Sequence, residues 1–234
     1  MNEIYAGGVA ENAAPFFVSK AKVVAITKPL VEGINTVEEF LAYCARVSNP
    51  ANQTNNTTAR KLLKYLIREK HWSPLEMGNI VVEIETPRDI GRQLLRHGSF
   101  KFQEFSQRYA QVTEFAMREA RRQDLKNRQN SIDDLDVYVR YAWGEKIKEL
   151  SNHAKELYEW ALEKGIAKEC ARVVLPEGLT VSRMYVNGSF RSWYHYLELR
   201  EGNGTQYEHI QLAQSIREAI TKELGEDSLF EKEV

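Results

Sequence analysis

Three short runs of β-type residues, separated by stretches of helical periodicity, most constrain the fold of this chain. The runs are AKVVAITKPL (21–30), NIVVEIET (79–86) and GLTVSRMYV (178–186). One or two helical stretches lie between strands, without a strict βαβ alternation, so we expect an α+β fold with a small, mostly antiparallel sheet flanked by helices. Residues 1–20 are expected to form an N-terminal arm, and 21–234 a single domain.

Helical periodicity begins soon after the first run. The segment 35–48 opens with a capping box of Thr36 and Glu39. The residues that share its expected inner face are Phe40, Tyr43, Cys44 and Val47. A second helix is expected over 57–70. Its predicted buried stripe consists of Leu62, Leu63, Leu66 and Ile67.

The later part of the chain is also mostly helical. Thr86 is expected to cap a helix that has Pro87 at its first position, where the missing N–H has no cost. The polar stretch 121–134 is typical of a connection. A long helical segment follows residue 131, with periodicity over 135–164. The remaining expected helices are AKECARVVLP (167–176), FRSWYHYLELR (190–200) and YEHIQLAQSIREAITKEL (207–224).

Charge and cysteine content narrow the function classes. The chain has 32 Lys and Arg against 33 Asp and Glu, without the positive excess typical of proteins that hold long nucleic acids. We therefore expect a small-molecule partner and no nucleic acid. No run approaches membrane-spanning length, so no membrane is expected. Two lone cysteines and no secretory signal indicate a cytoplasmic location, or the host cytoplasm for a viral chain.

Several common chemistries lack their sequence patterns. The five histidines show no His-x-x-x-His spacing, and there is no Cys-x-x-Cys pair, so no metal is expected. No glycine-rich nucleotide-binding loop is present. Cys44 and Cys170 have apolar helical neighbours, which favours small core residues over nucleophiles.

The stretch RHGSFKFQEFSQRY (96–109) and the helix before it contain the densest group of functional side chains. Arg92 and Arg96 are four residues apart, so two like charges share a helix face, with Gln93 and His97 beside them. This face is either solvated or a binding site for an anion, which would convert the repulsion into attraction.

The periodicity changes within this stretch. Phe100 and Phe102 alternate with polar residues, as on a half-buried strand. In an extended chain Glu104, Ser106 and Arg108 would then share one side. A carboxylate, a hydroxyl and a guanidinium together can bind a small molecule that carries phosphate. The alternative is a Glu104–Arg108 ion pair on a helix.

The stretch resembles the signature R-H-R-x-x-S-x-N-E-x-S-x-R-Y of the flavin-dependent thymidylate synthases. The residues that match it are Arg96, His97, Glu104, Ser106, Arg108 and Tyr109. The residues that depart from it are Gly98 for arginine, Lys101 for serine and Gln103 for asparagine.

Two earlier segments resemble the same family in the same order. ARVS (45–48) resembles a segment whose serine contacts flavin, here Ser48. HWSPLEM (71–77) resembles an H-x-[ST]-P-x-E element, which gives His71, Ser73 and Glu76. Ser73 and Glu76 also fit an ordinary capping box, and both interpretations can hold together.

Two later segments extend the resemblance over roughly residues 21–224. ARVVLP resembles the segment that supplies a substrate arginine, here Arg172, and FRSWYHYLELR resembles a helix that gives Arg191, His195 and Arg200. At 100° per residue Arg191 and His195 share a face, whereas Arg200 points to nearly the opposite side. Three further positions are Gln206 at the family's spacing, Ser189 in place of the family's asparagine, and the nearby Asn187.

The resemblance implies methylation of dUMP to dTMP, with 5,10-methylenetetrahydrofolate as carbon donor and NADPH-reduced FAD as hydride source. It also implies a homotetramer with sites between protomers. The residues implied for FAD are Ser48, Ser73, Glu76, Arg96, His97, Gln103, Glu104, Arg191 and His195. Those implied for dUMP are Gln93, Glu104, Ser106, Arg108, Arg172 and Arg200. Ser106, Arg108 and Arg200 are the expected catalytic residues, with Arg200 stabilising charge on the uracil ring.

Two alternatives remain open from the sequence. The basic and aromatic stretch 96–109 could bind single-stranded RNA by stacking and charge neutralisation. A flavoprotein of the same fold could also have lost methylation, because Gly98, Lys101 and Gln103 fall where flavin is expected.

Overall fold

The molecule is an α+β domain built on one four-stranded antiparallel sheet. The structure, a computed structural model, describes residues 16–112, 114–225 and 227–231. The strands lie in the order β1-β2-β6-β3, and every neighbouring pair is antiparallel. They are β1 (Lys20–Ile26), β2 (Asn79–Pro87), β6 (Val181–Ser189) and β3 (Lys101–Glu104). The expected fold class is therefore confirmed.

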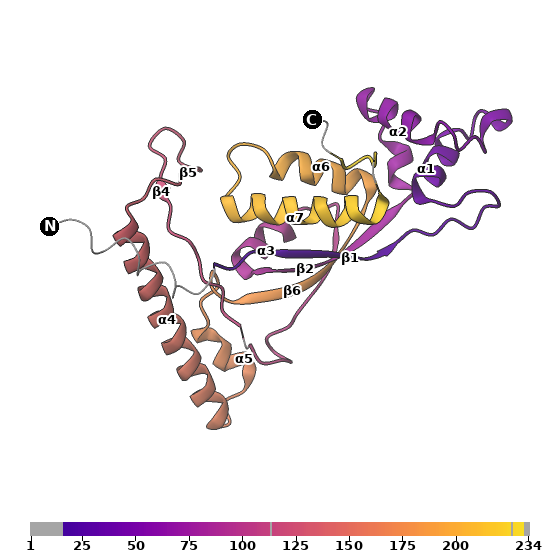
Figure 1. The fold of residues 1–234 in the computed structure, drawn as a ribbon. Coiled ribbons are helices and arrows are strands. Elements are labelled where there is room, and N and C mark those ends of the chain that lie inside the picture. Colours follow the sequence, from indigo (N-terminus) through magenta and orange to yellow (C-terminus); the bar gives the residue numbers. More distant parts are fainter. Residues whose placement is uncertain (1–15, 113, 226, 232–234) are drawn as a thin grey trace.

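The helices gather on one face and at the two ends of this sheet. Helices α6 and α7 lie together over one face, α1 and α2 over one end, and α4 with α5 beyond the other (Figure 1). Their bounds are α1 (Val37–Ala45), α2 (Ala59–Arg68), α3 (Arg88–Leu95), α4 (Val137–Glu163), α5 (Lys168–Ala171), α6 (Phe190–Arg200) and α7 (Tyr207–Leu224). Three 3-10 turns add η1 (Pro50–Asn52), η2 (Ser73–Glu76) and η3 (Arg172–Val174).

The ladder between β2 and β6 forms the centre of the sheet. It runs without interruption from Asn79 opposite Ser189 to Pro87 opposite Val181. Side chains alternate between the two faces, as a pleated strand requires. The inner row is fully buried and consists of Ile80, Val82, Ile84, Met184 and Val186. The outer row carries polar groups, among them Glu83, Glu85, Arg183, Tyr185 and Asn187.

Aromatic residues fill the space between the sheet and its helices. Phe100 is 3% exposed and lies 4.4 Å from Trp193 between ring centroids. A Cβ at Gly188 would collide with the Phe100 ring, so only glycine allows this close approach of ring and strand. Phe102 is partly buried against the same core, as the alternating pattern predicted.

A second, smaller core joins α4 to α5 and η3. It contains Val112, Tyr158, Ala161, Ala171 and Leu175. The predicted long helix is confirmed as α4, although much of its surface remains exposed in this chain. The exposed apolar residues of α4 include Val137, Tyr138, Val139, Tyr141, Trp143, Leu150, Leu157 and Trp160.

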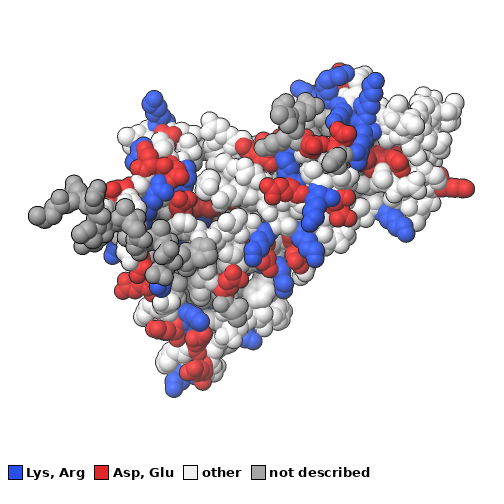
Figure 2. All heavy atoms as spheres, viewed as in Figure 1, with Lys and Arg blue, Asp and Glu red and all other residues white. Residues whose placement is uncertain are grey.

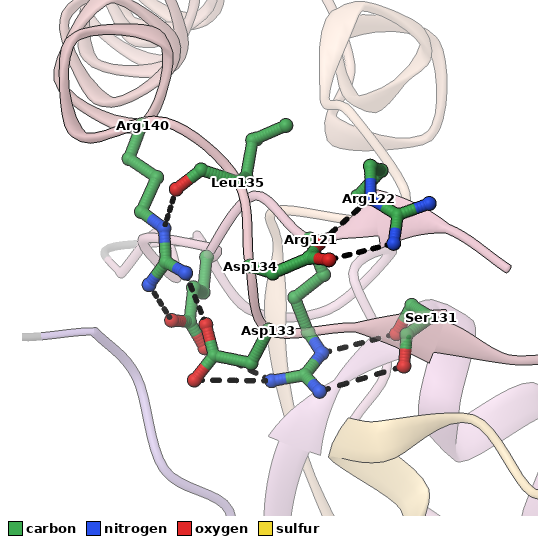
Figure 3. A network of polar contacts seen from close by, with 8 residues as sticks. Arg121, Arg122, Ser131, Asp133, Asp134, Leu135 and Arg140 are labelled. Atoms are coloured by element: carbon green, nitrogen blue, oxygen red, sulfur yellow. Dashed lines mark hydrogen bonds and ion pairs between the residues drawn. The ribbon is translucent and has the colours of Figure 1, made fainter.

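The polar stretch 121–134 is more ordered than a plain connection. It contains a short hairpin of β4 (Arg122–Gln123) and β5 (Ser131–Ile132). Arginines fasten this hairpin to the start of α4 (Figure 3). Arg122 pairs with Asp134 at 2.6 Å, Arg121 donates to Ser131 Oγ at 3.0 Å, and Arg140 pairs with Asp133 and donates to the Leu135 carbonyl. These contacts hold the hairpin in a fixed position, and it borders the start of α7 across a polar cavity.

Three local predictions need correction, and one is confirmed. The capping box of Thr36 and Glu39 forms as expected. The expected inner face of the first helix is wrong, because the buried residues of α1 are Val37, Glu38, Leu41 and Ala42. Val47 lies past the end of α1 and is 68% exposed, since the core contacts α1 from the side of Leu41.

The other two corrections concern expected helix caps. Thr86 is a buried residue of β2 whose hydroxyl bonds to Ser19 at 2.9 Å, so Pro87 rather than Thr86 precedes α3. Ser73 makes no capping hydrogen bond, because the segment turns as the short 3-10 helix η2. Most of the predicted N-terminal arm, residues 1–15, lies outside the described part of the chain.

Candidate functional site

Two expected site residues meet where α3 and α6 end. Arg200 Nε donates a hydrogen bond to His97 Nε2 at 3.0 Å. Burial, together with the positive charges of Arg200 and Arg96, lowers the pKa of His97. The imidazole is therefore neutral near pH 7, accepts at Nε2 and carries its proton on Nδ1. This contact fixes the direction of the Arg200 guanidinium.

Gln93 joins a hydrogen-bond network whose inner part the sequence analysis missed. Its carboxamide contacts His209 Nδ1 at 3.2 Å and Gln206 Oε1 at 2.7 Å. His209 in turn contacts the Tyr196 hydroxyl at 3.0 Å. A signal was available, because His209 begins the apolar stripe of α7, and a polar group in such a stripe needs a partner. The stripe continues with Leu212, Ile216 and Ile220.

Glu104 is held by side chains from two elements, α3 and β6. Arg88 Nη1 lies 3.1 Å from its Oε1, and the Ser182 hydroxyl donates to the same oxygen at 3.0 Å. Arg92 lies 3.9 Å from Oε2 and also pairs with Glu177 at 2.9 Å. The Glu177 hydrogen bond raises the pKa of Arg92. The predicted repulsion between arginines on α3 is therefore offset by carboxylates, and the orientation of Glu104 is fixed.

The second half of the 96–109 stretch leaves the sheet. Strand β3 ends at Glu104, and the backbone N–H of Arg108 donates to Ser106 Oγ at 3.3 Å in a turn. The Arg108 guanidinium pairs with Glu169 of α5 at 3.4 Å, and both side chains are exposed. The helical Glu104–Arg108 pair is thus wrong, and so is the extended edge expected through Arg108, because the strand ends at Glu104 and residues 107–109 form a turn. Arg172, on η3 just after α5, is exposed as well.

A third group lies between η2 and the first turns of α6. Arg191 Nη1 donates to Glu76 Oε1 at 3.1 Å. The His195 ring lies 4.2 Å from the Trp72 ring between centroids. Burial, and then the charge of Arg191, lower the pKa of His195. Arg191 and His195 therefore both face η2, whereas Arg200 faces α3, as the helical spacing predicted.

The remaining expected flavin residues differ in what they offer a ligand. Ser48, Ser73 and Gln103 are exposed. Ser189 is buried and caps α6, because its hydroxyl accepts from the Ser192 backbone N–H at 3.2 Å. Asn187 is exposed on the outer face of β6. The Ser189 hydroxyl is engaged in capping α6, whereas the Asn187 side chain is exposed. Of the two residues, Asn187 is therefore the better placed to contact a ligand.

The expected FAD and dUMP residues line neither of two polar cavities found among the described residues. A polar cavity of about 270 Å³ lies between the β4–β5 hairpin and the start of α7, with Arg121, Gln206 and Tyr207 in its wall. A second cavity of about 170 Å³ lies beside Phe105 and Arg183. None of the residues expected to bind FAD or dUMP lines either cavity. Cofactor sites usually measure roughly 300–1,000 Å³, so neither cavity can enclose a dinucleotide.

The cysteines are placed differently from the expectation of two core residues. Cys44 is partly exposed and Cys170 is exposed, so that expectation is wrong for Cys170. Burial raises the pKa of the Cys44 thiol, which disfavours the thiolate needed for nucleophilic attack. Cys170 lies on the four-residue helix α5, whose inner contact is made by Ala171.

The described residues contain neither a candidate metal cluster nor a membrane-spanning helix. Across residues 16–112, 114–225 and 227–231, no group of three or more His, Cys, Asp or Glu side chains is arranged to hold a metal ion. In the same part of the chain, no helix combines the length and hydropathy that crossing a bilayer requires.

Comparison with known proteins identifies the family. The profile of the thymidylate synthase complementing protein family matches residues 29–224. A probable flavin-dependent thymidylate synthase of Paramecium bursaria Chlorella virus 1 is 54% identical over 204 residues, which is 87% of this chain and 94% of the viral protein. The chain belongs to the flavin-dependent thymidylate synthase family. The relative from Synechocystis sp. is 47% identical over 204 residues, covering 86% of this chain and 94% of the relative.

A solved structure supports the flavin-dependent thymidylate synthase fold. The crystal structure of the UMP/dUMP methylase PolB from Streptomyces cacaoi, bound with 5-Br dUMP, superposes with a TM-score of 0.72. The two proteins are 26% identical, and the match covers 87% of this chain and 90% of PolB. The same α+β architecture therefore holds a uridine nucleotide in that neighbour.

The buried imidazole of His209 should make this family member sensitive to acid. Burial, then the charges of Arg200 and His97, lower the pKa of His209 from 6.5 to about 3. Between these values the unfolded chain binds a proton that the folded chain does not. The free energy of unfolding should therefore fall by about 1.4 kcal/mol per pH unit as pH drops from 6 to 4.

This prediction is checked by urea unfolding at fixed protein concentration, comparing wild type with His209→Asn. The variant removes only this titration, so its stability should fall less steeply with decreasing pH. His97 and His195, whose pKa values are lowered too, are present in both proteins and cancel in the difference. Equal slopes for the two proteins would show that His209 becomes protonated in the folded state.

Proposed function

We propose that this chain methylates dUMP to dTMP, with 5,10-methylenetetrahydrofolate as carbon donor and FAD, reduced by NADPH, as cofactor. The observation that carries the proposal is the Arg200–His97 hydrogen bond. It brings the arginine expected to bind dUMP against the histidine expected to bind flavin. The type of reaction is proposed from the family match over residues 29–224.

The side chains offered to FAD fit that molecule chemically. FAD carries two phosphates and two flat ring systems. Arg96 is exposed at the end of α3, and the partly exposed Arg191 stands at the start of α6, so two guanidiniums are available for phosphate oxygens. The adjacent His195 and Trp72 rings offer flat surfaces. When bound, the reduced flavin supplies the hydride, and these residues bind and orient it.

The residues expected to hold dUMP suit different parts of the nucleotide. Arg108 and Arg172 are exposed guanidiniums suited to the phosphate, with the Ser106 hydroxyl beside Arg108. Arg200 is partly buried, where a fixed positive charge stabilises negative charge on the uracil ring most strongly. The neutral His97 keeps that guanidinium in one direction. Gln93 adds a carboxamide that can both donate and accept.

We propose that the working enzyme is a homotetramer whose sites lie between protomers. The dUMP residues fall into separate groups within one chain, with Arg108 beside Glu169 and Arg200 beside His97. A second chain could bring one group against the other, as repeated interfaces of a symmetric oligomer allow. The exposed aromatic residues of α4 and the bare outer face of the sheet are surfaces that such an assembly would cover.

The RNA-binding alternative is not favoured. Phe100 is buried in the core rather than available for base stacking. Positive and negative side chains are intermingled over the face seen in Figure 2, so that face has no continuous basic surface. We place the reaction in the cytoplasm, where the partly exposed Cys44 and the exposed Cys170 would remain reduced.

The function is tested with dUMP labelled with tritium at C5. Methylation replaces this hydrogen, so the FAD-loaded enzyme should release tritium to water when methylenetetrahydrofolate and NADPH are present. Arg200→Ala should lower the rate by about 100-fold or more, since a fixed positive charge opposite developing negative charge contributes at that level. A protein that binds FAD, shown by its visible spectrum, yet releases no tritium would instead be a flavoprotein without methylation activity.

Another prediction concerns Gly98, where the family signature has arginine. A Cβ at this position has no neighbour within 4 Å, and the φ angle of Gly98 is not positive, so a side chain fits without strain. Gly98→Arg should tighten FAD binding by roughly tenfold or more, because a charge-assisted hydrogen bond contributes about 1.5–3 kcal/mol. Gly98→Ala is the matched control, and flavin fluorescence titration measures all three. Equal affinities would mean that Lys101 already supplies this charge.

A further prediction tests whether the site lies between protomers. Arg108→Ala and Arg200→Ala should each be nearly inactive, because every site then lacks one arginine. Unfolding the two variants together and refolding them should restore activity at a minority of sites. Each variant refolded alone should stay inactive. Wild type refolded in the same way shows what fraction of activity the refolding procedure recovers. Mixed tetramers without activity would place both arginines in one chain's site.

A further inference from the structure

Five side chains, from α3, α6, α7 and the N-cap residue of α7, form one continuous chain of hydrogen bonds. The Tyr196 hydroxyl lies 3.0 Å from His209 Nε2, and His209 Nδ1 lies 3.2 Å from Gln93 Oε1. Gln93 Nε2 donates to Gln206 Oε1 at 2.7 Å, and Gln206 Nε2 donates to Glu208 Oε2 at 2.9 Å. One end of this chain is fully buried, and the other reaches the wall of the polar cavity.

The direction of every bond in this chain is fixed from the Glu208 end. Burial alone would raise the pKa of Glu208, but Arg118 at 2.9 Å outweighs it and lowers that pKa. Glu208 is therefore a carboxylate that only accepts hydrogen bonds. Gln206 must turn its NH₂ group toward Glu208 and its oxygen toward Gln93. Gln93 must then direct its NH₂ group at Gln206 and its oxygen at His209.

The same logic sets the tautomer of His209. Its Nδ1 faces the Gln93 oxygen, so Nδ1 carries the proton, and Nε2 accepts from the Tyr196 hydroxyl. The ring is 0% exposed, and burial together with the charge of Arg200 disfavours a positive charge on it. Burial also raises the pKa of Tyr196, which keeps its hydroxyl as a donor. His209 is thus a neutral imidazole with one defined donor.

We propose that His209 is a positioning residue for dUMP: its Nδ1–H holds the Gln93 carboxamide in one orientation, with the opposite orientation excluded by Glu208. An amide has two N–H groups and two carbonyl lone pairs, and the network uses one of each. The other N–H and lone pair are then presented to the nucleotide in a fixed direction. Holding a side chain in its binding conformation lowers the entropy lost when the ligand binds. The inference rests on the proposed function, which makes Gln93 a dUMP ligand.

The test compares two substitutions that differ in one hydrogen bond. In His209→Asn the side-chain NH₂ lies near the position of Nδ1 and still donates to Gln93. In His209→Leu the volume is filled and the donor is absent. Titration calorimetry of the FAD-loaded protein with dUMP should show roughly threefold to tenfold weaker binding for the leucine variant, the usual range for one hydrogen bond. The asparagine variant should bind dUMP within about twofold of wild type.

A purely structural role predicts the opposite order. Both variants leave the Tyr196 hydroxyl without its acceptor, but asparagine also leaves a void that leucine fills, so the asparagine variant should be the less stable in urea. If dUMP affinity follows stability, with asparagine weaker than leucine, His209 is only a core residue. Wild-type affinity in the leucine variant also overturns the proposal. FAD affinity should not change in either variant.

A spectroscopic measurement keeps the proposal testable if the leucine variant does not fold. In the wild-type protein, ¹⁵N chemical shifts of the His209 ring should report a proton on Nδ1 from pH 7 to pH 5. Glu208→Gln removes the fixed acceptor at the end of the chain, so the ring should become a mixture of tautomers and dUMP binding should weaken about threefold, a loss the size of one hydrogen bond. A proton on Nε2 in the wild-type protein overturns the proposal.

Failure of the proposed function gives a different result. If the FAD-loaded wild type does not bind dUMP, the substrate assignment is wrong, while the His209 tautomer is still read by NMR. If wild type binds dUMP but Gln93→Ala binds it equally well, Gln93 is not a ligand and the positioning role falls with it. If Gln93→Ala weakens dUMP binding and His209→Leu does not, only the role of His209 is overturned.

Discussion

The antiparallel ladder between β2 and β6 is the constraint on which the arrangement of functional side chains depends. Each strand continues directly into a helix, β2 into α3 at Arg88 and β6 into α6 at Phe190. Because the strands are antiparallel, the two helices start at opposite ends of the ladder, and both pack into the same core. Their C-terminal ends therefore meet, and the Arg200–His97 hydrogen bond marks that meeting point.

Burial of polar groups at this meeting point has a consequence for binding. An unpaired polar atom in the core costs about 1–3 kcal/mol, so the core accepts His209 only with both nitrogens paired. The same pairing fixes the direction of Gln93, which lies nearer the surface. Stability and preorganisation are thus linked here, because the bond that satisfies the buried ring also holds a side chain that contacts substrate in the proposed enzyme.

Much of the fold could be predicted because local periodicity and burial agreed. The ends of α6 and α7 match their predicted segments, and β2 alternates as its sequence indicates. The inner face of α1 could not be predicted, because both sides of that helix carry apolar residues and the contact through Leu41 comes from distant segments. Thr86 likewise fits a helix cap by its sequence position, but the ladder with β6 holds it in the strand.

The sequence by itself determined the family, because the residues of its signature stand at fixed spacings along the chain. It also determined that Arg191 and His195 share one helix face and Arg200 the other, since an α-helix has one geometry. Only the tertiary structure decided which side chains surround Glu104. It also decided that the buried His209 ring contacts Gln93. Such contacts join segments far apart in sequence, and they depend on how helices cross a sheet rather than on any local pattern.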